Sequence, residues 1–109
     1  MNGVIIPYTE TNATWTDISS GNGDCDYCIK NGVLYLKLDM QDTSGSLVQI
    51  GQIPSGITLL YDIMVTAYYD KNNGTIRYRT YYVDHNSGKI YGKCENLSGS
   101  YSTVISYPL

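Results

Sequence analysis

Three cysteines and a single histidine are the residues of this chain best suited to metal or redox chemistry. Cys25 and Cys28 are separated by two residues, which is the spacing of redox-active and metal-binding cysteine pairs. Cys94 and His85 could complete four ligands for a structural zinc ion. The alternative is three reduced, partly buried thiols, and we favour it because no strand–helix–strand context for a redox motif is predicted. We therefore expect no metal and no cofactor.

One predicted strand in the second half of the chain carries a face that could bind a ligand. Alternation places Arg77, Arg79 and Tyr81 on the same side of that strand. Guanidinium groups beside an aromatic ring can pair with an anion or stack on a sugar. Tyr68 and Trp15 are further aromatic candidates for contact with a sugar. The simpler interpretation is a solvated face, or arginines that meet a carboxylate of a neighbouring subunit.

No residue set typical of catalysis is recognisable in the sequence. His85 lies in a predicted loop, and no serine has the strand–turn–helix context of an activated nucleophile. The carboxylates fall on predicted strand faces or in turns, with no sign of a protonated and an ionised acid across a cleft. No glycine-rich phosphate loop precedes a helix, because no helix is predicted. We expect a binding or assembly module and not an enzyme.

The composition excludes several classes of partner. The 109 residues suit one domain, with 12 tyrosines, one tryptophan and no phenylalanine. Tyrosine suits half-buried positions in a wet interface or an oligomer contact, although it is also common in strands. A net charge of −3 without a lysine or arginine cluster argues against nucleic-acid binding. No apolar run approaches the ~20 residues of a membrane helix, and the N-terminus lacks the features of a signal peptide.

The elements that must position these residues are short strands. The clearest spans residues 33–40, where Leu34, Leu36, Leu38 and Met40 alternate with polar residues. The other predicted strands cover residues 14–18, 25–30 (a possible edge strand), 46–50, 59–69, 75–83, 89–93 and 101–107. Because turn signals separate these strands at regular spacing, we expect an all-β, antiparallel β-sandwich or jelly roll. Residues 1–13 would be a tether or short strand, and residues 14–109 the head domain.

A corner near the middle of the chain divides these strands into two groups. Pro54 has no N–H to donate to a sheet, and residues 53–56 have the pattern of a type I turn that ends at Gly56. Strands are predicted on both sides of this segment. We therefore expect residues 50–58 to form the crossing between two sheets.

The order of these features resembles a known family. The stretches that carry the resemblance are Trp15-Thr16-Asp17-Ile18, Asn31-Gly32-Val33-Leu34-Tyr35-Leu36, Ile50-Gly51-Gln52-Ile53-Pro54-Ser55-Gly56, Ser87-Gly88-Lys89-Ile90-Tyr91 and Ile105-Ser106-Tyr107-Pro108-Leu109. Together they resemble the C-terminal receptor-binding domains of tail-fibre and baseplate proteins from phages and prophages of Gram-positive bacteria. The resemblance covers roughly residues 14–109. After the corner, Ile57-Thr58-Leu59-Leu60 replaces the aromatic, basic and proline residues usual in the family.

The resemblance implies a small β-sandwich head, commonly trimeric, at the end of a fibre or baseplate. It implies assembly in the bacterial cytoplasm, a place in the virion tail, and contacts with other tail or baseplate proteins. The implied ligand is a host surface polysaccharide or a polymer of the teichoic-acid type. The alternatives are a purely structural module that trimerises or caps a fibre, and a polysaccharide-degrading enzyme. The family's binding residues vary too much for any of them to be carried over to this chain.

Overall fold

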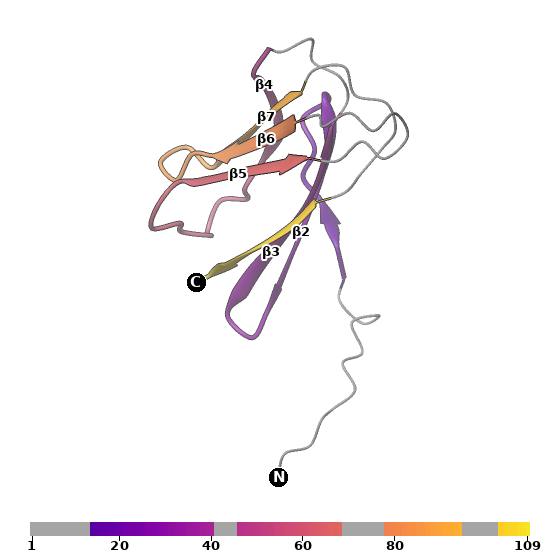
Figure 1. Cartoon of the computed structure of the whole chain (residues 1–109). Coiled ribbons are helices and arrows are strands. Elements are labelled where there is room, and N and C mark those ends of the chain that lie inside the picture. Colours follow the sequence, from indigo (N-terminus) through magenta and orange to yellow (C-terminus); the bar gives the residue numbers. More distant parts are fainter. Residues whose placement is uncertain (1–13, 41–45, 69–77, 95–102) are drawn as a thin grey trace.

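The computed structural model of the chain describes residues 14–40, 46–68, 78–94 and 103–109. Within these residues the chain forms eight strands and no helix. They are β1 (Thr16–Asp17), β2 (Gly23–Lys30), β3 (Val33–Met40), β4 (Val48–Gln52), β5 (Ile63–Tyr68), β6 (Tyr78–Val83), β7 (Lys89–Cys94) and β8 (Thr103–Pro108). The strands pair antiparallel in two sheets, sheet A in the order β1-β2-β3-β8 and sheet B in the order β4-β7-β6-β5 (Figure 1). The predicted all-β, two-sheet architecture is confirmed.

The β2–β3 hairpin is the frame of sheet A. Asn31 and Gly32 form its turn with φ angles of 53° and 77°, which suit a tight two-residue hairpin. All eight residues of β2 pair with all eight of β3. Leu34, Leu36 and Leu38 point inward and are fully buried. The period-two pattern of residues 33–40 thus predicted both the strand and its buried face. By contrast β2 is an interior strand, because β1 pairs with its other side, so the predicted edge position is wrong.

The corner around Pro54 has a different role from the predicted one. Strands β4 and β5, which flank it, are the two outer strands of the same sheet. The chain changes sheets between β3 and β4, and the corner carries it from one edge of sheet B to the other. The strand expected over residues 59–69 begins only at Ile63. The crossing between sheets was assigned to the wrong segment because sequence alone gave no pairing partner for β4.

One hydrophobic core joins the two sheets. Sheet A contributes the inward leucines of β3, and sheet B contributes Ile50, Val83 and Ile90, each fully buried. Tyr107 of β8 is 1% exposed, and its hydroxyl accepts hydrogen bonds from the backbone N–H groups of Leu60 (2.5 Å) and Tyr61 (2.9 Å). The last strand of sheet A therefore holds the segment that leads into β5.

Some predictions lie outside the described residues. They include the tether at residues 1–13, the first part of the strand expected at 75–83, and the start of the last strand at 101–102. In the part of the chain that is described, no helix has the length and apolar character to cross a membrane.

Candidate functional site

Strand β6 turns its predicted ligand face into the core. Arg79 is 4% exposed and Tyr81 is 1% exposed, so neither presents a surface to a ligand in this chain. The alternation was predicted correctly and the side was inverted. Inward-facing Val83 shares the face of Tyr81, and this face packs against sheet A. Both faces of β6 carry polar or aromatic residues, so its own sequence does not show which side is buried.

Arg79 instead links the two sheets from within. Its guanidinium Nη1 lies 3.4 Å from Oδ1 of Asp39 at the end of β3, and the Arg79 side chain is 5% exposed. The Tyr81 hydroxyl donates to the carbonyl of Leu38 at 3.5 Å. Burial raises the pKa of Tyr81, while the neighbouring Arg79 opposes that rise. These groups stabilise the contact between sheets and also hold Asp39 in place.

The structure does not describe the side chains of two other residues predicted to contact a ligand. Arg77 lies outside the described residues. Tyr68 ends strand β5, and only its backbone is described. Their assignment as ligand contacts stays a prediction.

The three cysteines and His85 do not gather into a metal site. Cys25 and Cys28 are three residues apart in β2, so their side chains lie on opposite faces of sheet A. All three cysteines are buried, and no disulfide joins them. His85 lies instead near Asp62 and Asp84. Strand geometry thus separates the first two members of the four-ligand zinc set considered from the sequence.

An acidic groove lies on the outer face of sheet A, the side that points away from sheet B. It has a volume of about 240 Å³ and is lined by Asp17, Asp24, Asp26, Lys37 and Asp39. The register explains this gathering, because Asp17 pairs with Asp26, Asp26 with Lys37, and Asp24 with Asp39 across β1, β2 and β3. Side chains directly opposite one another in a ladder lie close together.

Trp15 stands beside this acidic groove. The ammonium group of Lys37 lies 4.9 Å from the centre of the Trp15 ring and 3.6 Å from Oδ2 of Asp26. A cation at that distance from an indole ring is attracted to its face. Trp15, which the sequence singled out, thus connects through one lysine to carboxylates that the sequence did not single out. Alternation in residues 23–30, read with that of β3, could have found these carboxylates.

The groove presents hydrogen-bond acceptors next to an aromatic ring. The Ser19 hydroxyl and backbone N–H both donate to Oδ1 of Asp17, at 2.5 and 2.8 Å. These bonds lower the pKa of Asp17, the hydroxyl contributing most, and the Asp17 carboxyl is ionised at neutral pH. Ionised carboxylates accept hydrogen bonds from hydroxyl groups, and an aromatic ring packs on the apolar face of a sugar. The groove therefore has the chemistry to hold a sugar.

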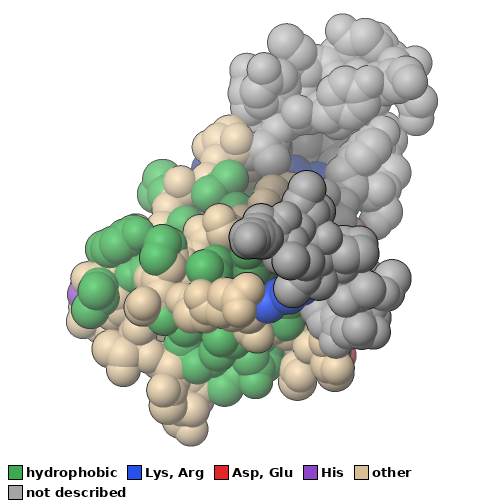
Figure 2. Space-filling view, turned by 90° about the horizontal axis from the view of Figure 1, so that it is seen from below, with side chains coloured by type: hydrophobic (Ala, Val, Ile, Leu, Met, Phe, Trp, Pro, Cys, Tyr) green, Lys and Arg blue, Asp and Glu red, His purple; other side chains and the backbone are tan. Residues whose placement is uncertain are grey.

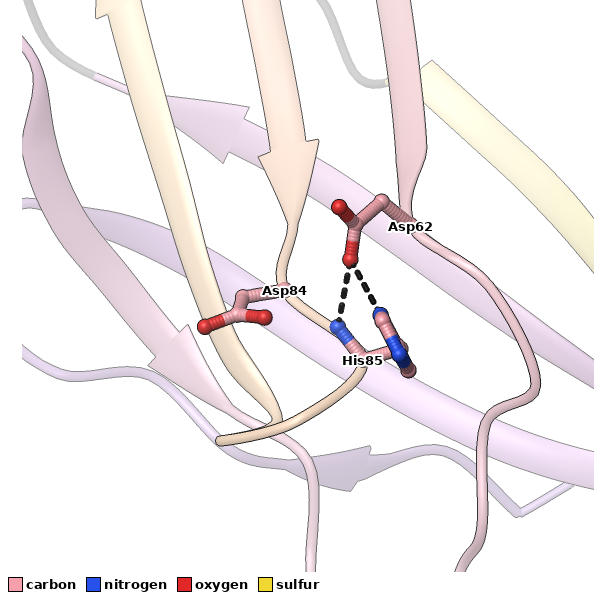
Figure 3. Close-up of side chains that lie close together, drawn as sticks. All are labelled: Asp62, Asp84 and His85. Atoms are coloured by element: carbon pink, nitrogen blue, oxygen red, sulfur yellow. Dashed lines mark hydrogen bonds and ion pairs between the residues drawn. The ribbon is translucent and has the colours of Figure 1, made fainter.

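A second cluster of polar and aromatic side chains lies on sheet B. Nδ1 of His85 lies 2.6 Å from Oδ1 of Asp62, and the backbone N–H of His85 donates to the same oxygen at 2.9 Å (Figure 3). The Tyr82 hydroxyl donates to Oδ2 of Asp62 at 3.1 Å. The bond from the His85 backbone is the main cause that lowers the pKa of Asp62, and the bond to Asp62 raises the pKa of Tyr82.

Asp84 lies close to Asp62 and His85, but its carboxylate accepts hydrogen bonds within the turn between β6 and β7. Its carboxylate accepts bonds from the backbone N–H of Asn86 (3.1 Å) and the hydroxyl of Ser87 (2.9 Å). One carboxylate oxygen of Asp84, one of Asp62 and a ring nitrogen of His85 lie within 4.8 Å of one another (Figure 3). Asp62, Asp84 and His85 form the group of potential metal ligands found among the described residues. Their existing hydrogen bonds account for how they are arranged.

Comparison with solved structures shows where else this fold occurs. The chain is similar to the crystal structure of the head domain of lactococcal phage bIL170, described as a receptor-binding domain, with a TM-score of 0.54 and 24% sequence identity. The match covers 90% of this chain and 99% of that one. No protein-family model matches the sequence, and no curated protein does. The chain therefore has the fold of a phage receptor-binding head domain, as the resemblance predicted.

Proposed function

We propose that this domain is a phage or prophage tail adhesion domain that binds host cell-surface polysaccharide without cleaving it. The observation that carries this proposal is the fold shared with the bIL170 head domain over nearly the full length of both chains. The domain would act in the virion tail, after assembly in the bacterial cytoplasm with other tail or baseplate proteins. It would work as a homotrimer, in which three weak sites raise the avidity for a repetitive polymer.

The acidic groove beside Trp15 is the proposed contact with the polysaccharide. The Trp15 ring would stack on a sugar, and the carboxylates of Asp17, Asp24 and Asp26 would accept its hydroxyl groups. The Trp15 side chain is only partly buried. A groove with four carboxylates and one lysine repels phosphate. We therefore expect this site to take a sugar unit rather than the phosphate of a teichoic-acid-type polymer.

The absence of a recognisable catalytic residue set and the state of one groove carboxylate, Asp17, support the proposal of a non-catalytic domain. Glycoside hydrolysis needs one carboxyl group that stays protonated while its partner is ionised. Hydrogen bonds from Ser19 lower the pKa of Asp17, which is the opposite of what a general acid requires. Release of reducing ends from purified host cell walls by the domain would contradict the proposal and favour the enzyme alternative.

Adsorption to cells tests the proposed function, and Trp15 provides a direct readout. Because Trp15 is the only tryptophan, its fluorescence reports on the groove alone. We expect the full chain to adsorb to lactococcal cells, and purified lactococcal wall polysaccharide to change its fluorescence. Trp15→Ala should weaken adsorption about tenfold, as expected when a stacked ring worth about 1.4 kcal/mol is removed. Leu47→Ala removes an exposed apolar side chain in the linker before β4 and should have no effect. A wild-type domain that adsorbs to no Gram-positive host would sink the proposal.

A structural module remains the second candidate, because one end of the molecule is apolar. Leu60 is 73% exposed and Tyr61 55%, and both contact Tyr107; Leu109, 50% exposed, lies two residues after Tyr107 in the chain. We call these three residues the apolar end. Figure 2, seen from below relative to Figure 1, shows hydrophobic side chains gathered over the described part of the lower face. Exposed apolar patches often mark contacts with other chains. If this alternative holds, the domain assembles through the apolar end and adsorbs to no host cell.

A further inference from the structure

We infer that the outer face of sheet B is a second carbohydrate-binding surface, which takes a neutral sugar unit. The inference rests on the proposed function and adds a site on the side of the sandwich opposite the acidic groove. The surface consists of Met64, Tyr82 and Tyr91 with the Asp62–His85 pair bonded to Tyr82, and we call it the tyrosine platform.

The row of side chains across sheet B is the first support. Met64 of β5 pairs with Tyr82 of β6, and Tyr82 pairs with Tyr91 of β7. The two tyrosine rings are stacked, with centres 6.0 Å apart and planes inclined by 27°. Met64 is 69% exposed and extends the row to the edge of the sheet. The stacked rings and the exposed thioether place apolar side chains in one row, and aromatic side chains pack on the C–H face of a sugar ring.

Polar groups bonded to Tyr82, the middle residue of the row, are the second support. The Tyr82 hydroxyl is bonded to Oδ2 of Asp62, whose Oδ1 is bonded to His85. The side chains of His85 and Asp62 are 35% and 44% exposed, so both reach solvent. A carboxylate and an imidazole offer acceptors and a donor to sugar hydroxyl groups. Apolar contact beside a few fixed polar groups is the usual composition of a small-ligand site.

The site is also held rigid before any ligand arrives. The turn from Asp84 to Lys89 is closed by backbone bonds from Gly88 to Asp84 (2.8 Å) and from Asp84 to Lys89 (3.0 Å). The Asp84 carboxylate adds two further bonds within that turn. Tyr82 and Tyr91 lie on the two inner strands of sheet B. A preformed surface loses little entropy on binding, which matters for a weak contact.

The charges around the platform favour an uncharged ligand. Asp62 and Asp84 lie beside His85, and Lys89 and Lys93 each lie two residues from Tyr91 and are exposed. Among the described residues, two carboxylates and two ammonium groups balance, so these give the platform no formal excess of either sign. This distinguishes it from the acidic groove, where carboxylates outnumber lysines four to one. The tyrosine platform therefore selects by shape and stacking, with little contribution from charge.

Nuclear magnetic resonance of the full chain tests the inference with N-acetylglucosamine, galactose and rhamnose as probes and inorganic phosphate as the charged control. At least one neutral sugar should shift the ring signals of Tyr82 and Tyr91, and phosphate should not. Tyr91→Ala should lower the affinity for that sugar about three- to tenfold, which is the effect of losing one aromatic contact. Tyr91→Phe should bind as the wild type does, which separates stacking from a folding defect. Tyr35→Ala alters an outward tyrosine of sheet A and should change nothing.

The outcomes separate this inference from the proposed function. If none of the three sugars shifts the two rings, or if Tyr91→Ala binds like the wild type, the tyrosine platform is not a sugar site. If phosphate shifts the rings more than the sugars do, the assignment of a neutral ligand is wrong. Adsorption to cells that depends on Trp15 but not on Tyr91 would leave the proposed function intact and overturn this inference alone. Absence of any adsorption would count against the proposed function itself.

Discussion

Burial in the fold alters the chemistry of the Cys25 thiol. It is fully buried between β3 and β4, and burial raises the pKa of its thiol from 9.0 to about 12. The carboxylates of Asp26, Asp24 and Asp17 add to the rise, because they disfavour a thiolate. A thiol in this state is a poor nucleophile and a poor metal ligand at neutral pH. The electrostatics of the acidic groove thus extend to the core residue beneath it.

The raised pKa of Cys25 predicts a loss of stability in alkali. In the unfolded chain the thiol releases its proton near pH 9, whereas the folded chain retains the proton to about pH 12. The contribution of the protonated Cys25 thiol to the free energy of unfolding is therefore fully present below pH 9 and is lost as pH rises from 9 to 12. At pH 10 the loss is about 1.4 kcal/mol. Urea unfolding at pH 8 and pH 10 should show this loss in the wild type and a correspondingly smaller one in Cys25→Ala. Equal losses in both proteins would disprove the assignment.

The buried Arg79–Asp39 pair predicts a second effect on stability. Arg79→Leu leaves a largely buried carboxylate without this partner and should lower the free energy of unfolding by about 3 kcal/mol. Lys37→Leu removes the exposed partner of Asp26 and should cost less than about 1 kcal/mol. Chemical denaturation measures both. The double variant Arg79→Leu, Asp39→Leu should regain part of the loss, and a double variant less stable than Arg79→Leu would refute this account.

Single residues also show where sequence patterns are ambiguous. In β3 one face is wholly aliphatic, so alternation predicted both the strand and its buried side. In β6 Tyr81 faces the core and Tyr82 faces solvent, and the two side chains are chemically identical. Burial there depends on the partner sheet, through the contacts of Arg79 with Asp39 and of Tyr81 with Leu38. Both tyrosines satisfy the same pattern, and only tertiary contacts distinguish them.

At the scale of elements, strand β4 depends on a glycine that lies against β2. A Cβ on Gly51 would lie 2.9 Å from both Cβ and Sγ of Cys25 and 3.0 Å from the carbonyl of Ile18. Gly56, in the corner, has a φ of 97° and open space around it. Gly51 is thus required for close packing and Gly56 for backbone conformation.

This difference predicts unequal costs for two similar substitutions. Gly51→Ala should destabilise the domain by about 2–3 kcal/mol, because a strand backbone must shift. Gly56→Ala should cost about 1 kcal/mol, the penalty for a left-handed conformation. Thermal or urea unfolding of both variants measures these costs. A Gly56→Ala variant less stable than Gly51→Ala would show that the corner, and not the contact of β4 with β2, limits the packing of sheet B.

Local elements were predictable from the sequence, and their pairing was not. The Asn31-Gly32 turn has strong local chemistry, and its hairpin forms as expected. The corner at Pro54 also forms a turn, but it joins two strands of one sheet. Pairing of β4 with β7 connects residues about forty positions apart, and a bulge between Gln49 and Gly51 shifts its register. Sequence periodicity carries no information on such distant partners. Strands β1, β2 and β3 form the groove together. For the same reason, the sequence predicted Trp15 as a ligand contact but not the groove carboxylates.

At the scale of the whole molecule, the domain has three separate candidate surfaces for contact with other molecules. Sheet A has an acidic groove on its outer face, sheet B has the tyrosine platform on its own, and the apolar end lies at Leu60, Tyr61 and Leu109. Among the described residues the two candidate ligand surfaces lie on different sheets, and the proposed assembly would use a third surface. The proposed adhesion and the proposed assembly therefore do not compete for the same residues.

Assembly through the apolar end gives the last prediction. Light scattering after size exclusion, at micromolar concentration, should give the wild type three times the 12.1 kDa mass of the chain. The double variant Leu60→Glu, Leu109→Glu should run as a monomer, because it places two carboxylates where apolar side chains would be buried between chains. Leu47→Glu, which changes an exposed leucine elsewhere, should remain trimeric. The inward-facing core is unchanged in all three proteins, so their far-ultraviolet circular dichroism should agree. A monomeric wild type would refute the trimer, and a double variant that stays trimeric would place the interface on another surface.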